Sequence, residues 1–240
     1  MIPRITDSTE SAPPSPQQFR YPLPMPIARD RILYEDEHLL AVNKLSGELV
    51  VKGSGKTEKL PLFDFLKKEY AGLRALHRLD FETSGVIIFA RTKEAYEKVM
   101  ETKFAGWKKF YRAILLERMD RKRGEIAKPL PARMSGTPIP SLTKYSVLRA
   151  YTHATYVEAE IETGRHHQIR KHFAAIGYPL LLDDLYGQKK LNRLFTQEFG
   201  YHRFFLHAVC TELPHPITGA KIVIEAPLPK PFVDVLKRLL

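Results

Sequence analysis

Short runs of alternating or continuously apolar residues, separated by turn residues, dominate the sequence from residue 31 onward. Alternation of apolar and polar residues is typical of a half-buried strand, and a short continuous apolar run between turns is typical of a buried one. The run from Val86 to Ala90 is the clearest example of the second kind. Strands are predicted at 31–34, 39–43, 48–51, 86–90, 109–116, 142–151, 155–162, 204–213 and 221–225.

Four other stretches read as helices. In the third of them, Ile169, Phe173 and Ile176 fall on one stripe at spacings of four and three, and Gly177 ends the pattern. Helices are predicted at 60–70, 93–104, 165–176 and 231–239. Because strands outnumber helices and many are joined by short turns, we expect an α+β fold with a mixed, largely antiparallel central sheet and flanking helices.

The first 28 residues differ from the rest of the chain. They contain seven of the 18 prolines and show no amphipathic period. We interpret residues 1–28 as a Pro-rich N-terminal extension and residues 29–240 as a single domain, since 44% hydrophobic residues can supply an ordinary core.

Charge points to a polyanionic partner. The formal net charge is +11. Residues 101–150 hold twelve Lys or Arg against four Asp or Glu, so the excess is concentrated in the middle of the chain. Such clustering favours a nucleic-acid-binding face, with a merely soluble basic protein as the alternative.

One cysteine, Cys210, excludes an internal disulfide and a Cys-rich zinc site. No apolar run approaches the roughly 20 residues that span a bilayer, and the N-terminus lacks the order of a signal peptide. We therefore expect a cytoplasmic protein without membrane contact.

Candidate chemistry centres on Asp80. If Arg78 and Asp80 lie in an extended segment, alternation points both side chains to one face and presents the carboxylate beside a guanidinium. The turn residues Thr83, Ser84 and Gly85 lead directly into the apolar run at Val86, which would hold this loop rigidly. The alternative is a solvated loop acid with a surface ion pair.

The whole string from 77 to 86, HRLDFETSGV, resembles the active-site motif of the RluA-type pseudouridine synthases, which is His-Arg-Leu-Asp, two variable residues and Thr-Ser-Gly. Further blocks agree with that family in its order, and together they cover roughly residues 30 to 230. Accidental agreement of several ordered blocks is improbable. The blocks are 35–47, 109–113 (KFYRA), 163–172 (TGRHHQIRKH), 179–187 (PLLLDDLYG) and 206–219.

Two residues depart from the family pattern. Leu45 stands where the family has proline, and Leu182 stands where it has glycine. The second departure affects a turn, because leucine does not easily adopt a positive φ.

The resemblance implies a pseudouridine synthase-like domain with an RNA-binding cleft, and it makes Asp80 the catalytic nucleophile. In the family, the arginine of the His-Gln-(Ile/Leu)-Arg block, here Arg170, pairs with that aspartate. Converting uridine to pseudouridine involves no redox change and no lost group, so we expect no cofactor. Asp80 could attack C1′ or C6 or assist loss of the 2′ proton, and the sequence does not separate these routes.

Other residues are expected to contact the RNA. Tyr111 could stack on the extruded uracil, although a tyrosine on an alternating strand is ordinarily half-buried packing. Arg78 could fill the gap left in the RNA or bind a flanking phosphate. The remaining candidates are basic or aromatic residues near the motifs, namely Arg165, Lys108, Lys109, His77 and the cluster 121–123, the last of which also reads as a solvated loop.

The histidines have a second interpretation. His166, His167 and His172 invite a metal hypothesis, but adjacent histidines on a helix diverge, and no pair has the i, i+4 spacing of a zinc-binding helix. We expect no metal site. A structural hydrogen-bonding role is the alternative for His77 and the expectation for His207 and His215.

Three hypotheses remain. The first is an RNA pseudouridine synthase acting, as a monomer, on structured RNA, either ribosomal or transfer RNA. The second is a catalytically inactive RNA-binding or RNA-chaperone protein of the same fold. The third is a metal-dependent hydrolase built on the histidines, which would be inhibited by chelators.

Overall fold

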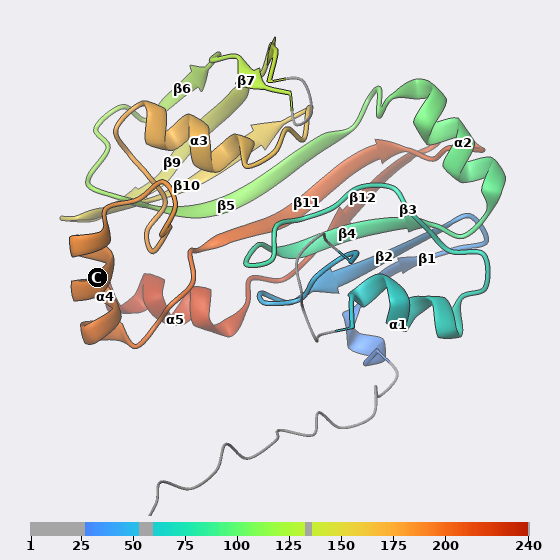
Figure 1. Ribbon diagram of the computed structural model, residues 1–240, viewed down its shortest axis with the longest axis horizontal. Coiled ribbons are helices and arrows are strands. Elements are labelled where there is room, and N and C mark those ends of the chain that lie inside the picture. Colours follow the sequence, from blue (N-terminus) through green and yellow to red (C-terminus); the bar gives the residue numbers. More distant parts are fainter. Residues whose placement is uncertain (1–26, 53–59, 133–135, 240) are drawn as a thin grey trace, which may run out of the picture.

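The computed structural model describes residues 27–52, 60–132 and 136–239 (Figure 1). The predicted N-terminal extension, 1–28, therefore lies almost wholly outside the described residues. The elements are a 3-10 turn η1 (Arg29–Arg31), β1 (Ile32–Glu35), β2 (Leu39–Lys44), α1 (Leu62–Glu69), β3 (Arg74–Ala75), β4 (Ser84–Ala90), α2 (Lys93–Thr102), β5 (Lys108–Leu116), β6 (Arg123–Ile126), β7 (Leu130–Pro131), β8 (Pro138–Ile139), β9 (Thr143–Ala150), β10 (Ala154–Ile161), α3 (Gln168–Ala175), α4 (Lys189–Phe199), β11 (Leu206–Pro214), β12 (Lys221–Glu225) and α5 (Lys230–Arg238).

A ten-stranded mixed sheet forms the framework, as predicted. Its order is β1-β2-β4-β11-β5-β10-β9-β6, with β12 paired to β11 and β3 paired to β4. The β4–β11 pair is parallel and the other pairs are antiparallel. Strands β7 and β8 form a separate two-stranded sheet. None of the helices in the described part of the chain is long and apolar enough to cross a membrane.

Helices cover both faces of this sheet, and strand alternation decides which residues meet them (Figure 1). On β5, Leu115 belongs to the core beneath α1 and α3, whereas its neighbour Ile114 belongs to the core beneath α5. Helix α2 packs through Ala95 and Val99 on a third cluster with Ile88 and Trp107. The face that carries α1 and α3 is the face that carries the candidate site.

The predicted strand at 48–51 is wrong. The N–H groups of Leu62 and Phe63 donate to the carbonyls of Leu49 and Val50, at 2.7 and 3.0 Å. This segment therefore satisfies the first N–H groups of α1, which have no partner within the helix, and it pairs with no strand. Helix α3 begins at Gln168, three residues later than predicted. The helix α4 and the short strands β3, β6, β7 and β8 were not predicted.

Strand register fixes the loop that precedes β4. Gly85 lies opposite Ala208 of β11, and Ala208 lies opposite Tyr111 of β5. Gly85 has φ +106°, and a Cβ atom at this position would lie 2.2 Å from the carbonyl oxygen of Ala208. Only glycine allows this close approach. The Thr-Ser-Gly end of the motif thus brings the loop directly over the centre of the sheet.

Leu182 adopts the left-handed conformation that leucine disfavours, with φ +64°. Its side chain is buried, and the Asn192 amide supports the turn by accepting from the Leu182 N–H and donating to the Asp183 carbonyl, both at 3.1 Å. The turn is therefore retained without the family's glycine, at a conformational cost of about 1 to 2 kcal/mol.

We expect the free energy of unfolding of Leu182→Gly to exceed that of Leu182→Ala by about 1 kcal/mol. Both variants lose the leucine side chain, but only the alanine variant keeps a strained φ. Chemical denaturation measures the difference. The matched control is Glu97 on the exposed face of α2, where the order should reverse and glycine should be the less stable of the two. Equal stability of the Leu182 pair would contradict the strain.

Candidate active site

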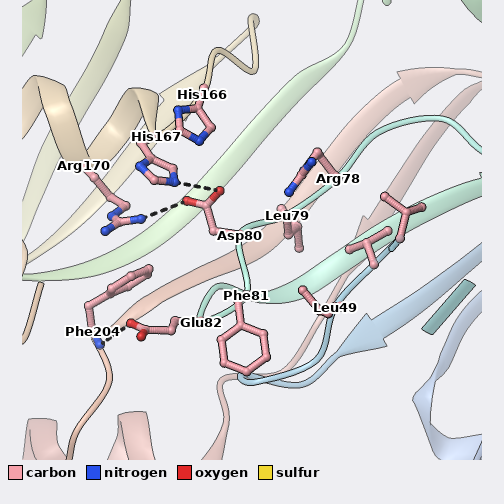
Figure 2. Close-up of a pocket in the computed structure, with 12 residues that line it drawn as sticks. Leu49, Arg78, Leu79, Asp80, Phe81, Glu82, His166, His167, Arg170 and Phe204 are labelled. Atoms are coloured by element: carbon pink, nitrogen blue, oxygen red, sulfur yellow. Dashed lines mark hydrogen bonds and ion pairs between the residues drawn. The ribbon is translucent and has the colours of Figure 1, made fainter. Parts of the chain in front are cut away.

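Asp80 lies in an open pocket of about 270 Å³ between the loop before β4 and the start of α3 (Figure 2). Its side chain is 24% exposed, so the carboxylate is neither buried nor freely solvated. The Thr83 N–H donates to the Asp80 carbonyl at 3.2 Å and closes a tight turn after the aspartate. Residues lining the pocket include Leu49, Arg78, Phe81, Glu82, His166, His167, Arg170 and Phe204.

Arg170 connects two carboxylates. Its Nη1 lies 3.5 Å from Oδ2 of Asp80, while Nε and Nη2 lie 2.6 and 2.9 Å from the two oxygens of Asp183. The family resemblance implied a pair between Arg170 and Asp80. The structure brings these residues together, but the bidentate partner of the arginine is Asp183, which the sequence reasoning did not include in the site.

Asp183 anchors this arrangement from a fully buried position. One of its oxygens also accepts the N–H groups of Leu185 and Tyr186, each at 3.0 Å. Burial raises the pKa of Asp183, but the hydrogen bonds from Arg170 and the backbone outweigh burial and lower the pKa below its ordinary value. Burial has the opposite effect on the pKa of Arg170 and lowers it, but the carboxylates of Asp183 and Asp80 outweigh burial and raise that pKa above its ordinary value. Both groups are therefore held in their charged forms.

Arg170 is also enclosed by aromatic rings. Its guanidinium lies 4.4 Å from the ring centre of Phe204 and 5.1 Å from that of Tyr186. A planar cation between ring faces loses little freedom when it binds a carboxylate. The Arg170 guanidinium, whose Nη1 faces Asp80, is thus held in a fixed orientation.

Lys44 supports the Asp80 loop from below, and its side chain is completely buried. Its ammonium donates to three carbonyls, those of Leu45, Phe81 and Thr83, at 3.1, 3.1 and 2.5 Å. Burial lowers the pKa of Lys44 to about 7, and the charges of Glu48 and Asp80 oppose that shift. Two of the three carbonyls flank the turn after Asp80, so Lys44 ties the end of β2 to that turn. The sequence reasoning assigned Lys44 no role.

Leu45, the residue that replaces the family's proline, is largely exposed. Its N–H, which a proline would lack, donates to the Glu48 carboxylate at 2.8 Å. Glu48 in turn forms a bidentate pair with Arg31. A hydrogen bond to this ion pair thus holds the turn that the family builds with proline.

Tyr111 and Lys109 project from β5 on the same side, and both are buried. Burial and the charge of Asp80 raise the pKa of Tyr111, so its hydroxyl stays protonated. The Lys109 ammonium lies 5.1 and 5.6 Å from the ring centres of Phe104 and Trp107, and burial lowers its pKa to about 8. Lys109 thus packs against these two rings, and its phosphate contact stays a prediction.

Several other predicted RNA contacts are exposed. Arg78 lines the pocket, Arg165 lies just before α3, and Lys108 begins β5. The cluster 121–123 leads into β6, which lies at the edge of the sheet, three strands away from β5. Of these exposed residues, Arg78 lines the pocket, and Arg165 is the chain neighbour of His166, which also lines it.

Three histidines outside the pocket, His77, His207 and His215, make structural hydrogen bonds. His77 Nε2 accepts the Ile88 N–H at 3.2 Å, and burial, with a smaller contribution from Lys109, lowers its pKa to about 3. His207 bridges the Ser84 hydroxyl and the Ala226 carbonyl. His215 accepts the N–H groups of Ile217 and Thr218 through Nδ1. His77 thus supports the loop, and its contact with RNA stays a prediction.

His167 also belongs to the site, although the sequence suggested it only as a possible metal ligand. Its Nε2 lies 3.6 Å from Oδ1 of Asp80, and its Nδ1 lies 3.0 Å from the hydroxyl of Tyr186. Among the described residues, no group of three or more His, Cys, Asp or Glu side chains is placed to hold a metal ion.

Solved structures place the architecture in the pseudouridine synthase class. The human RNA pseudouridylate synthase domain containing 4 superposes with a TM-score of 0.72 at 26% identity, covering 88% of this chain and 93% of its own. The human RNA pseudouridylate synthase domain containing 1 has a TM-score of 0.64 at 24% identity, covering 87% and 93%, and shows the same fold.

The sequence gives the family. A family model described as RNA pseudouridylate synthase matches residues 38–175, a span that contains Asp80 and Arg170. The ribosomal large subunit pseudouridine synthase C of Escherichia coli K12 is 35% identical over 223 residues, covering 88% of this chain and 70% of the relative. Its namesake from Vibrio cholerae is 32% identical over 217 residues, covering 87% and 69%. The chain belongs to the RNA pseudouridylate synthase family, and it is an RNA pseudouridine synthase, an isomerase.

Proposed function

We propose that this enzyme isomerises specific uridines of structured ribosomal RNA to pseudouridine, with Asp80 as the nucleophile. The observation that carries the proposal is the setting of Asp80. The loop before β4 presents Asp80 to the open pocket, with Arg170 and His167 on one side and Arg78 on the other (Figure 2). Glu82, the second carboxylate of this loop that lines the pocket, instead accepts the Phe204 N–H at 3.5 Å.

The chemistry needs few groups. The bond between C1′ and N1 of the uridine breaks, the uracil turns while it stays in the pocket, and a bond between C1′ and C5 forms, after which C5 loses its proton and N1 carries one. The atoms of the nucleotide are conserved, so no external oxidant or reductant is required. Asp80 can attack C1′ or C6, or assist loss of the 2′ proton, and each route uses the same oriented carboxylate.

The target base must first leave its stack, at a cost of a few kcal/mol. Exposed Arg78, at the pocket rim, can occupy the vacated position or hold a flanking phosphate, and Arg165 can hold the backbone on the α3 side. Tyr111 is buried and close enough to Asp80 for that charge to raise its pKa, and stacking of its ring on the extruded uracil stays a prediction. Binding through phosphates should weaken steeply with salt.

The choice of ribosomal over transfer RNA rests on the names of the relatives in Escherichia coli and Vibrio cholerae, which are ribosomal large subunit synthases. We also propose that the enzyme acts as a monomer in the cytoplasm. The described structure contains a complete pocket within one chain.

The test is release of tritium from RNA that carries 5-tritiated uridine and comes from cells lacking this gene. Loss of the C5 proton makes release a direct measure of isomerisation. We expect the purified protein to release tritium from the large ribosomal RNA fraction, undiminished by a chelator, and not from the transfer RNA fraction. Release from transfer RNA alone would overturn the substrate, and release from neither fraction would overturn the activity.

A further inference from the structure

His167 contacts both the nucleophile and a second protein group. Its Nε2 lies 3.6 Å from Oδ1 of Asp80 and its Nδ1 lies 3.0 Å from the Tyr186 hydroxyl. Arg170 faces the other oxygen of Asp80, Oδ2. Figure 2 shows both contacts reaching the carboxylate from the α3 side, which leaves its opposite side turned toward the pocket.

The ring of His167 is held in place by its neighbours. His166 stacks on it with ring centres 3.7 Å apart and planes 23° apart, and Tyr186 meets it edge-on at 5.7 Å. The backbone of His167 has φ 55°, in the left-handed region. Non-glycine residues in this conformation are uncommon and cluster at functional sites. This residue also interrupts the helix predicted to start at 165, and so turns its ring away from the helix surface toward Asp80.

The hydrogen-bonding partners select one tautomer. A carboxylate only accepts hydrogen bonds, so the nitrogen that faces Asp80 is stabilised when it carries the proton. The other nitrogen then offers a lone pair, and the Tyr186 hydroxyl can donate to it. Donation therefore runs from Tyr186 to Nδ1 and from Nε2 to Asp80.

We propose, on the basis of the proposed function, that His167 is a positioning residue: as the neutral Nε2–H tautomer fixed by Tyr186, it donates to Oδ1 of Asp80 and sets the direction in which the carboxylate meets the uridine. The present 3.6 Å separation shortens to a hydrogen bond when substrate fills the pocket, as contacts in empty active sites commonly do. A neutral donor orients the carboxylate without neutralising its charge.

The charges around His167 agree with a neutral ring. Burial lowers its pKa to about 4; the nearby charges of Arg170, His166 and Lys171 lower it too, while Asp80 raises it. Tyr186 faces it without a charge. Removing the Tyr186 hydroxyl removes the donor that favours an unprotonated Nδ1, so protonation of the ring should become easier in Tyr186→Phe.

The first test is the tautomer itself, read from the nitrogen shifts of ¹⁵N-histidine in the whole protein at pH 7, with His167→Gln used to assign the signal. We expect a protonated Nε2 and an unprotonated Nδ1. A protonated Nδ1, or an imidazolium at this pH, would overturn the inference. This measurement needs no substrate, so it is independent of the proposed function.

The second test is kinetic, with two amide variants. Asparagine tolerates the left-handed backbone but is too short to reach Asp80, whereas glutamine can place its NH₂ group near the position of Nε2. We expect His167→Asn to lower kcat by about 10²-fold with KM nearly unchanged, the scale of a misplaced reacting group, and His167→Gln to recover much of the loss. His153→Gln, at an exposed turn, is the control and should match the wild type.

The third test is the pH profile. The acidic limb of kcat should move to higher pH in Tyr186→Phe, because an imidazolium beside Asp80 weakens the nucleophile. Equal losses in the two His167 variants, wild-type kcat in His167→Asn, or an unmoved acidic limb would each overturn the positioning role. If the wild type itself released no tritium, the proposed function would fail, and the tautomer measurement would still decide the inference.

Discussion

Asp80→Asn should abolish tritium release from 5-tritiated RNA, with a loss in kcat of about 10⁴-fold or more, the scale seen when other enzymes lose their nucleophile. The substitution keeps the size of the side chain, removes its charge and its nucleophilic oxygen, and replaces one of its two acceptor oxygens by an NH₂ donor. Because Asp80 is partly exposed and its loop is held by Lys44 and Arg170, the fold should survive.

RNA affinity separates this result from general damage. Phosphate contacts come from arginines such as Arg78 and Arg165, so the Kd of Asp80→Asn for RNA should stay within a few-fold of the wild-type value. Asp120→Asn is the matched control, since the Asp120 side chain is 91% exposed and pairs with Arg118 instead of the pocket residues, and it should retain full activity. Substantial turnover by Asp80→Asn would show that neither the charge nor the nucleophilic oxygen of Asp80 is needed, and would contradict the proposed role of this residue.

Asp183→Asn should lower the free energy of unfolding by about 3 to 5 kcal/mol, because it leaves the Arg170 guanidinium buried with one charged partner fewer. The neighbouring Asp184 is exposed, so Asp184→Asn changes the same charge one residue away and should change stability by less than about 1 kcal/mol. Chemical denaturation of the two variants at pH 7 makes the comparison, and turnover should fall only in Asp183→Asn, since Arg170 then loses its fixed direction. Equal stability of the two variants would contradict the anchoring role.

The pH dependence of that difference has a definite sign. The pKa of Asp183 is lowered in the folded protein, so its contribution to stability is fully present above the ordinary carboxyl pKa of 3.8 and is lost as the pH falls through the folded value. The stability gap between the wild type and Asp183→Asn should therefore be constant from neutral pH to about pH 5 and should narrow in more acidic solution. A gap that widens on acidification would show that another group dominates.

Much of the fold could be predicted because its strands carry their own hydrophobic pattern. The run at 86–90 becomes β4, fully buried in the sheet, and the alternation from 109 to 116 becomes most of β5. The helix that was missed, α4, has a polar residue, Asn192, as its buried position. A search for apolar periodicity does not find a helix whose buried position is an asparagine that bonds to a turn.

The candidate site was predictable in part for a related reason. Asp80 and Arg170 stand in motifs that resemble the family's, and the structure brings them within 3.5 Å. Lys44 was missed because a lysine at the end of a strand ordinarily lies in solvent, and here its ammonium is buried under three carbonyls. His167 was missed because helical periodicity assumes a right-handed backbone, which this residue does not have. Long-range pairing and local backbone reversal leave no periodic trace in a sequence.

The central claim, that the Asp80 carboxylate isomerises uridine in ribosomal RNA, has one most direct test. Pseudouridines are mapped chemically across the ribosomal RNA of cells that lack this gene and are complemented with the wild type, with Asp80→Asn or with an empty vector. The account predicts that defined pseudouridines in the large subunit RNA disappear without the gene, return with the wild type and stay absent with Asp80→Asn expressed at the same level. Their return with Asp80→Asn, or a map unchanged by loss of the gene, would contradict it.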